Sequence, residues 1–335
     1  MIEVSAGVVR RADGAVLICQ RGEGRHNAHL WEFPGGKREP GETAEACLIR
    51  ELREELSLSV RNVKALCEQE AEGIRFTFLT AETDEMPSLT EHEAALFVSA
   101  REMLRYPFCP ADEPIARALA LNDPPLRHFF WDFDGTLMDT YPMMTDAFLR
   151  AAQSMGVTVV RDRALNLLKE TLAYGAGVIA GENGLDAEKL IAAFRREERM
   201  DEVTALPGIP EALRALRALG GRHYLVTHRD RQAMECLRGA GLLELFEDAV
   251  TREDGLPRKP EPDMLLRLLD RHGLNPAECV MIGDRPLDTA AGRRAGMLSC
   301  LLDPEGRFPE DACELRARAA AELAELLCPA LPGAC

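Results

Sequence analysis

No run of hydrophobic residues in this 335-residue chain approaches the roughly 20 residues that cross a bilayer. Excess positive charge is also missing. Lys+Arg 40 against Asp+Glu 56 gives a formal net charge of −16, which argues against duplex nucleic acid as a partner. The ten cysteines contain no C-x-x-C pair, so we expect reduced, mostly buried thiols rather than a zinc site. The opening residues lack a basic flank and an apolar core, so we predict no signal peptide, no membrane partner and a cytoplasmic location.

Hydrophobic residues make up 46% of the chain, enough for a sizeable core, and the length suggests about two domains. The boundary falls at Asn122-Asp123-Pro124-Pro125-Leu126, because consecutive prolines end a helix and favour extended backbone. We therefore predict a first domain at 1–122, a linker at 123–128 and a second domain at 129–335.

The first domain shows a mixture of strand and helix patterns. These patterns predict strands at 4–10, 15–21 and 75–80, and helices at 43–56 and 111–121. We expect Thr43 to cap the helix at 43–56. We expect the buried positions of that helix to be Ala46, Ile49, Leu52 and Leu56.

In the second domain, short apolar runs are each followed by a helical pattern. The runs lie at 129–131, 224–226 and 279–282. Such runs are typical of buried parallel strands, and the pattern predicts an α/β fold with a doubly wound parallel sheet. Ligands of that fold bind at the carboxyl ends of the strands.

Three acidic residues lie on one face of the helix predicted at 43–56. Glu51, Glu54 and Glu55 are spaced i, i+3 and i+4, so their carboxylates repel one another unless a cation binds them. Oxygen ligands suit Mg²⁺, with Mn²⁺ as the alternative. Taken alone, the segment could equally be a solvated helix face.

The spacing to earlier residues changes that interpretation. The segment that begins at Gly36 resembles the Nudix box. Five residues separate Gly36 from Glu42, and seven residues separate Glu42 from the run Arg50-Glu51-Leu52-Arg53-Glu54-Glu55. Ser57 stands where the box has glycine, a departure at the helix exit rather than at the metal ligands. Residues 1–122 look closest to the MutT branch, which implies an α/β/α sandwich with a mixed sheet.

The resemblance also implies roles for individual residues. Metal ligands would be Glu42, Glu51, Glu54 and Glu55, with Glu51 and Glu54 taking part in catalysis and Arg50 orienting carboxylates. Glu91 would be a further ligand or base, with Glu93 as the alternative, and the substrate side would comprise Arg21, Phe33, Gly35 and Asp112. The implied reaction is attack of a metal-activated water on a nucleoside triphosphate, releasing a monophosphate and pyrophosphate.

Asp112 is the candidate for reading the base. The resemblance implies asparagine at this place in enzymes specific for 8-oxo-guanine and aspartate in relatives that act on cytosine nucleotides. We favour an 8-oxo-dGTP-type substrate on overall resemblance, with CTP or a modified dCTP as the alternative. Asp112 could instead only cap the following helix.

A second set of polar residues follows the strands predicted in the second domain. Asp132 and Asp134 alternate past an apolar run, so they face the same side. Thr227, Lys259, Asp284 and Asp288 follow in order, and each alone could be a helix cap, a surface charge or a turn residue. Together they resemble the four motifs of haloacid dehalogenase-like (HAD) phosphatases, over roughly 127–310.

That resemblance implies phosphoryl transfer through the protein. Asp132 would be the nucleophile that forms an aspartyl-phosphate, and Asp134 the acid and then the base. Thr227 and Lys259 would hold phosphoryl oxygens, and Mg²⁺ would lie between Asp132, the Asp134 carbonyl and Asp284, with Asp288 supporting.

The helical insert at about 139–206 looks like the cap of the phosphoglycolate phosphatase-like branch, with substrate contact from a loop at 174–177. The tail at 313–327 is predicted to be a closing helix.

We therefore predict a bifunctional hydrolase that acts on nucleotide and phosphomonoester substrates. The monophosphate from the first half could be the substrate of the second. The alternative is a phosphatase for a phosphoglycolate-like substrate whose Nudix half senses a nucleotide without cleaving it. The sequence gives no oligomeric state.

Overall fold

The chain folds into two compact units. The structure, a computed structural model, describes residues 1–309 and 312–331. One unit comprises Met1–Pro125 together with the chain from Leu327 onward, and the other comprises Leu126–Leu326. No helix in the described ranges is long and apolar enough to span a membrane.

The N-terminal unit is built on a seven-stranded mixed sheet. Its central path runs β3 (Trp31–Glu32), β2 (Val16–Gln20), β1 (Ile2–Arg10), β6 (Ile74–Glu82) and β5 (Arg61–Ala71). Strand β4 (Gly35–Lys37) pairs with β1, and β7 (Ala94–Val98) pairs with β2. The β1–β6 pair is parallel, whereas β1–β2 and β5–β6 are antiparallel.

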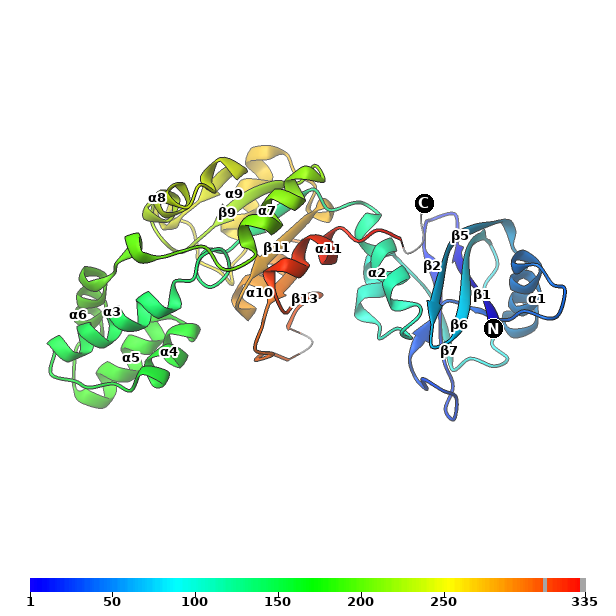
Figure 1. Ribbon diagram of the computed structural model, residues 1–335, viewed down its shortest axis with the longest axis horizontal. Coiled ribbons are helices and arrows are strands. Elements are labelled where there is room, and N and C mark those ends of the chain that lie inside the picture. Colours follow the sequence, from blue (N-terminus) through cyan, green and yellow to red (C-terminus); the bar gives the residue numbers. More distant parts are fainter. Residues whose placement is uncertain (310–311, 332–335) are drawn as a thin grey trace. The chain divides into compact units, whose positions relative to one another are not determined.

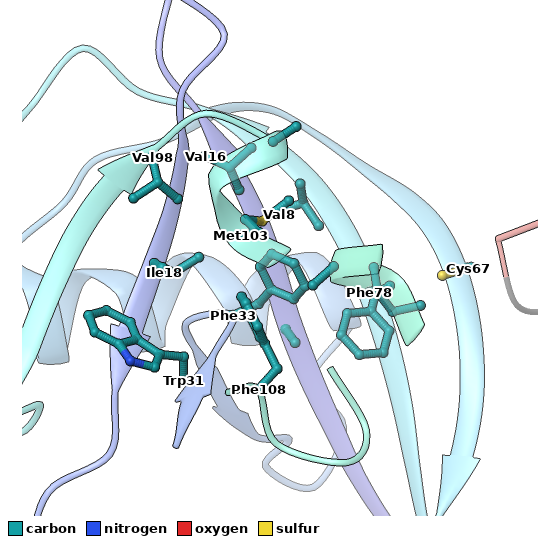
Figure 2. Packing of buried hydrophobic residues seen from close by; sticks show 14 residues of the cluster. Val8, Val16, Ile18, Trp31, Phe33, Cys67, Phe78, Val98, Met103 and Phe108 are labelled. Atoms are coloured by element: carbon teal, nitrogen blue, oxygen red, sulfur yellow. The ribbon is translucent and has the colours of Figure 1, made fainter. Parts of the chain in front are cut away.

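Helices α1 (Ala44–Leu56) and α2 (Glu113–Asn122) lie on opposite sides of this sheet, as Figure 1 shows. Alternate strand residues supply the two cores between sheet and helices, as the twofold period of a strand requires. Val8 packs in the cluster that contains Ile115 of α2, and its neighbour Val9 packs in the cluster that contains Leu48 of α1. Figure 2 shows the first of these clusters. The sheet is therefore the middle layer of an α/β/α sandwich.

Two of the four residues predicted to be buried on helix α1, Leu52 and Leu56, are confirmed, and the other two predictions are wrong. The buried residues of this helix are Cys47, Leu48, Leu52 and Leu56, whereas Ala46 and Ile49 are exposed. The buried row runs i, i+4 and i+8 from Leu48, a stripe neighbouring the one we expected. The Thr43 hydroxyl accepts a hydrogen bond from the Ala46 N–H at 3.2 Å, which confirms the predicted cap.

The C-terminal unit contains a six-stranded sheet in which every pair of neighbouring strands is parallel. The order is β10 (Phe246–Val250), β9 (Arg222–Val226), β8 (His128–Trp131), β11 (Cys279–Gly283), β12 (Leu298–Leu302) and β13 (Leu315–Ala317). Chain order and spatial order reverse between β8 and β11. The three strands predicted from apolar runs are therefore the adjacent central strands β9, β8 and β11, and their carboxyl ends meet.

Four helices form an insert between β8 and β9. They are α3 (Tyr141–Ser154), α4 (Arg161–Glu170), α5 (Leu172–Asn183) and α6 (Ala187–Glu197). They share one hydrophobic cluster and form a separate bundle, green in Figure 1. The predicted contact loop at 174–177 is wrong, because these residues lie within α5, where the Thr171 hydroxyl caps the first turn. The Gly-Ala-Gly sequence was misleading because Gly175 lies against helix α4, where a Cβ would come within 3.2 Å of Leu167.

The end of the chain also differs from the prediction. Residues 315–317 form strand β13, and helix α11 (Leu323–Leu327) covers only the end of the predicted tail helix. The chain from Leu327 onward was assigned by sequence to the second domain but groups with the N-terminal unit. Leu331 packs on that unit's hydrophobic cluster, and the Asn122 amide donates to the Pro329 carbonyl at 3.0 Å. These contacts join residues far apart in the sequence, so no local sequence pattern predicts them.

Candidate active sites

Arg50 organises the acidic face of α1. Its guanidinium donates to both carboxylate oxygens of Glu42, at 3.0 and 3.1 Å, and lies 2.9 Å from Glu51 and 3.2 Å from Glu54. It also donates to the Lys37 carbonyl at 3.2 Å. The hydrogen bonds from Arg50 lower the pKa of Glu42 to about 2. Arg50 therefore orients carboxylates from a loop and a helix by bidentate pairing.

Glu51 lies directly against the glycine of strand β4. A Cβ atom on Gly36 would lie 2.3 Å from the Glu51 carboxylate, so any other residue there would displace it. This contact explains the fixed spacing between the Gly-Gly turn and the helix. The backbone of β4 and the carboxylate of α1 occupy neighbouring space, and only glycine leaves room for both.

A row of polar side chains leads from Arg21 to Glu55 through two residues that the sequence analysis did not name. Arg21 forms an ion pair with Glu32, Glu32 lies 3.4 Å from Nε2 of His92, and Nδ1 of His92 lies 3.8 Å from Glu55. Burial, with the nearby carboxylates of Glu51 and Glu91, raises the pKa of Glu55 to about 7. Glu32 and His92 are partners of site residues that no motif indicates.

The predicted substrate residues line one cavity of about 420 Å³. Its lining includes Arg21, Phe33, Gly35 and Asp112 as well as Glu51 and Glu55 of α1. Phe33 packs against Phe108 with ring centroids 5.5 Å apart, an arrangement visible in Figure 2. The cavity lining therefore combines carboxylates with aromatic rings, which suits a ligand with a phosphate tail and a base.

Asp112 lines the same cavity and is buried. Its Oδ1 accepts a hydrogen bond from the Phe33 N–H at 2.9 Å, and it makes no capping bond to α2. The capping alternative is therefore wrong. Burial raises the pKa of Asp112 to about 8, against the opposing effect of the Phe33 N–H, so this side chain is mostly protonated at neutral pH.

Two further glutamates lie on the loop before β7. Glu91 forms an ion pair with Arg25, and Glu93 lies 2.9 Å from Nδ1 of His29. Glu91 is close enough to Glu55 to affect its pKa. The predicted role of Glu91 as ligand or base stays a prediction, because Arg25 holds its carboxylate in this structure.

In the C-terminal unit, a buried lysine joins two of the predicted aspartates. Nζ of Lys259 lies 2.5 Å from Asp132 Oδ1 and 2.6 Å from Asp288 Oδ1, and donates to the Val226 carbonyl at 3.0 Å. All three side chains are at most 3% exposed. Burial alone would lower the pKa of Lys259, but the two carboxylates outweigh it and raise the pKa.

Asp132, Asp284 and Asp288 form the one group of three potential metal ligands found among residues 1–309 and 312–331. Their ligand atoms lie within 4.8 Å of one another. Asp132 Oδ2 and Asp284 Oδ1 are buried without a hydrogen-bond partner, and burial raises the pKa of Asp284 to about 7. A Cβ on Gly283 would lie 2.3 Å from the Asp288 side chain, so glycine makes room for that carboxylate. This all-oxygen donor set fits a hard divalent cation.

The remaining predicted residues surround this cluster. Thr227 is buried at the end of β9, and its Oγ1 accepts a hydrogen bond from the Arg229 N–H at 3.0 Å. Asp134 Oδ1 accepts a hydrogen bond from the Arg229 guanidinium at 2.7 Å. Lys259 is fixed through its backbone, whose N–H donates to Nε2 of His228 at 2.9 Å.

Sequence reasoning missed three side chains in this cluster. Tyr141, the first residue of α3, donates its hydroxyl to Asp284 at 2.6 Å. Arg285 lies 3.5 Å from Asp284 and 3.9 Å from Asp132, and Arg229 contacts Asp134. Arg285 directly follows Asp284, and Arg229 lies two residues after Thr227, but the sequence does not give the direction of either side chain.

Comparison with protein-family models matches residues 1–119 to the NUDIX domain and residues 126–296 to the haloacid dehalogenase-like hydrolases. The chain belongs to both families. It is a hydrolase that joins a Nudix domain to a HAD phosphatase domain, as the motifs predicted.

Known relatives match the two domains separately. Over the Nudix domain, the chain is 40% identical across 124 residues to the CTP pyrophosphohydrolase of Escherichia coli, covering 35% of this chain and 90% of that protein. Over the HAD domain, it is 33% identical across 189 residues to the phosphoglycolate phosphatase of Nitrosospira multiformis, covering 51% and 81%. A solved HAD family hydrolase from Deinococcus radiodurans, with bound phosphate and sodium, is 25% identical with a TM-score of 0.51, covering 62% and 99%.

Proposed function

We propose that the chain is a bifunctional Mg²⁺-dependent hydrolase. Its Nudix domain cleaves a cytosine nucleoside triphosphate to the monophosphate and pyrophosphate, and its HAD domain hydrolyses a phosphomonoester through an aspartyl-phosphate. The observation that carries this proposal is the presence of two separate carboxylate sets, one around Arg50 and one around Lys259. Each set lies within its own compact unit.

In the Nudix domain, the carboxylates that contact or flank Arg50 would hold the cation. These are Glu42, Glu51, Glu54 and Glu55. When bound, the cation supplies charge neutralisation on the phosphates and a more acidic water, and Mn²⁺ is its nearest substitute. Arg50 orients the carboxylates that it contacts, and Arg21 and Phe33 line the cavity that takes the nucleotide.

Asp112 supports cytosine as the base. Because its Oδ1 already accepts the Phe33 N–H and its pKa is raised to about 8, the remaining oxygen carries a proton at pH 7 and can donate. A donor matches the unprotonated N3 of cytosine and conflicts with the N3–H of uracil. The similarity to a CTP pyrophosphohydrolase supports the same choice. An 8-oxo-guanine nucleotide, whose carbonyl oxygens also accept, is the second candidate.

Base choice can be tested by pH. The ratio of kcat/KM for CTP to that for UTP should fall as the pH rises through about 8, because ionised Asp112 no longer donates. The Asp112→Asn variant keeps a donor that does not titrate, so its ratio should stay constant. A wild-type ratio that does not change with pH would exclude Asp112 as the base-reading group. A higher kcat/KM for 8-oxo-dGTP than for CTP would favour the second candidate.

In the HAD domain, Asp132 is placed to attack phosphorus. As the P–O bond to the leaving group breaks, Asp134 gives its proton to the leaving oxygen. A water then gives a proton to Asp134 and attacks the phosphorus, which releases phosphate and restores the Asp132 carboxylate. Lys259 and Thr227 stabilise the phosphoryl oxygens. Asp132, Asp284 and the Asp134 carbonyl would hold Mg²⁺, which neutralises charge on those oxygens when bound.

Two substitutions test whether the sites are independent. Glu54→Gln should remove pyrophosphate release and leave phosphomonoester hydrolysis intact, and Asp132→Asn should do the reverse. Acid-quenched phosphoenzyme should map to Asp132. Loss of both activities in folded Glu54→Gln would contradict the two-site proposal. Nucleotide binding without pyrophosphate release by the unmutated chain would favour a sensing Nudix domain.

The substrate of the HAD domain can be read from products over time. If it acts on the monophosphate, the intact chain should convert CTP to cytidine, one phosphate and pyrophosphate. If it acts on pyrophosphate, the monophosphate should persist with two phosphates released. Persistence of both products beside rapid hydrolysis of phosphoglycolate would indicate two unrelated steps, as similarity to a phosphoglycolate phosphatase suggests.

A further inference from the structure

One buried arginine connects the acid-base residue of the HAD domain to the helical cap. The Arg229 guanidinium donates through Nε to Asp134 Oδ1 at 2.7 Å and through Nη1 to Glu198 Oε1 at 2.8 Å. The side chains of Arg229, Asp134 and Glu198 are 13%, 17% and 17% exposed. Both ion pairs are thus largely shielded from solvent, where charge-assisted hydrogen bonds hold geometry well.

The three residues come from different parts of the unit. Asp134 follows β8, Arg229 follows β9, and Glu198 immediately follows cap helix α6. The cap joins the sheet through two neighbouring segments, where the Asp139 N–H donates to the Thr204 carbonyl at 2.9 Å. Asp134 and Glu198 therefore lie on opposite sides of the cap boundary, and Arg229 bridges it.

Arg229 is also fixed to the phosphoryl-binding side of the site. Its N–H donates to Oγ1 of Thr227 at 3.0 Å, and its guanidinium lies 5.9 Å from the ring centroid of Phe133. Its Nη1 also lies 3.2 Å from Sδ of Met200, on the segment that returns from the cap. An arginine held at so many points has little freedom, so it can hold Asp134 in one place.

We propose that Arg229 is a positioning residue that sets the placement of Asp134 and links that placement to the cap through Glu198. This rests on the proposed phosphomonoesterase reaction, in which Asp134 protonates the leaving oxygen. If Arg229 served only to hold the cap on the sheet, its loss would not affect proton transfer from Asp134 to the leaving oxygen. The positioning role and the purely structural role therefore predict different dependence of the rate on the leaving group.

The test compares phosphoglycolate, whose leaving group is an alkyl oxygen, with p-nitrophenyl phosphate, whose leaving oxygen needs little protonation. Loss of a general acid typically costs about 10²- to 10⁴-fold in rate when the proton is needed. For Arg229→Met, which keeps Asp134 itself, we expect kcat for phosphoglycolate to fall by about 30- to 100-fold, at or below the lower end of that range, and kcat for the aryl ester to fall several times less. Glu198→Gln should shift the same ratio in the same direction by a smaller factor.

A double variant identifies the residue through which Arg229 acts. If Arg229 works through Asp134, then Asp134→Asn combined with Arg229→Met should lose no more phosphoglycolate activity than Asp134→Asn alone. Arg271→Met is the matched control, because Arg271 forms a 2.7 Å ion pair with Asp248 on the edge strand β10. That variant should change neither rate by more than about twofold, as expected for an exposed pair.

Arg229→Lys and Glu198→Gln keep the test usable if Arg229→Met fails to fold, as thermal melting would reveal. Equal losses on both substrates in folded variants, or additive losses in the double variant, would overturn the positioning role alone. A wild-type chain that hydrolysed neither ester would instead refute the proposed phosphatase function and this role with it.

Discussion

The two active sites solve the problem of gathering carboxylates in opposite ways. In the HAD domain, Asp132 and Asp284 follow the adjacent strands β8 and β11, and Asp288 lies in helix α10 (Pro286–Arg294). The buried Lys259 pairs with Asp132 and Asp288. In the Nudix domain, the glutamates lie on one helix and a nearby loop, and Arg50, whose side chain is 24% exposed, keeps them in place. The first site is assembled by tertiary structure and the second by helical spacing.

The difference in burial determines how strongly the carboxylates of each site depend on a neighbouring positive charge. Buried carboxylates need a cation at all times, because an uncompensated charge in the interior costs several kcal/mol. The Nudix glutamates all keep some contact with solvent, from 14% exposure for Glu42, Glu51 and Glu55 to 60% for Glu54, so solvent and Arg50 can stabilise their charge until a ligand arrives. We therefore expect that removing the cationic side chain of Lys259 lowers both the stability of the HAD domain and its activity. Removing the cationic side chain of Arg50 should lower mainly the activity of the Nudix domain.

The largest effect should come from Lys259→Met. It leaves Asp132 and Asp288 without their shared cation, and breaking a buried pair this way typically costs about 3–5 kcal/mol. Phosphomonoester hydrolysis should fall by at least about 10²- to 10³-fold, as when other electrostatic stabilisers are removed. Urea denaturation and steady-state kinetics measure the two losses.

Excess Mg²⁺ should restore part of the stability lost in Lys259→Met, because a bound cation can compensate the same carboxylates. Lys189→Met, at an exposed position on cap helix α6, is the control and should be neutral. Unchanged stability of Lys259→Met in the absence of metal would show that the HAD carboxylates do not need a resident cation.

Arg50→Gln should have a large effect on activity and a small one on stability. It removes the bidentate bond to Glu42 and the contacts with Glu51 and Glu54. Partners that orient metal ligands usually affect activity by about 10- to 100-fold, whereas exposed ion pairs contribute at most about 1 kcal/mol. Pyrophosphate release from CTP should fall accordingly while phosphomonoester hydrolysis is unchanged. A stability loss as large as that of Lys259→Met would remove the contrast between the sites.

Stability should depend on pH through Asp112. Its pKa is raised to about 8 in the folded protein, so between its ordinary pKa and 8 the folded state binds more protons than the unfolded state. The contribution of Asp112 to the free energy of unfolding therefore falls as the pH rises and levels off above 8. Nearby Glu32 raises this pKa and Arg21 opposes it, both less than burial does.

Asp112→Asn removes this titration, so its stability relative to the wild type should increase by about 2 kcal/mol between pH 6 and pH 8. Urea denaturation at the two values measures the change. Asp84→Asn, at an exposed carboxylate bonded to Arg61, should show a constant difference. A constant difference for Asp112→Asn as well would mean that Asp112 is ionised throughout this range.

The sequence predicted what spacing and strand ends determine. Glu51, Glu54 and Glu55 follow from helical geometry, and Asp132 and Asp284 follow from parallel strands whose carboxyl ends meet. The partners His92 and Arg229 could not be predicted, because a loop and a strand end bring them to residues more than 30 positions away. The buried face of α1 was misplaced because Ala46 and Ile49 form an apolar stripe next to the true one.

The smallest expected effect lies at the exit of the Nudix helix, where this chain departs from the usual glycine. Ser57 ends α1 in the left-handed conformation, with φ 54° and ψ 31°, and its N–H donates to the Leu52 carbonyl. A side chain in that conformation costs about 1 kcal/mol, part of which glycine loses again through its greater freedom when unfolded. Ser57→Gly should therefore stabilise the chain by about 0.5 kcal/mol. Ser57→Ala keeps the unfavourable conformation and should bring no gain.

Because Ser57 lies past the last carboxylate of the box, neither variant should alter pyrophosphate release. A change in that activity would mean that the helix exit helps to position Glu54 and Glu55, and that the Nudix site depends on more than helical spacing.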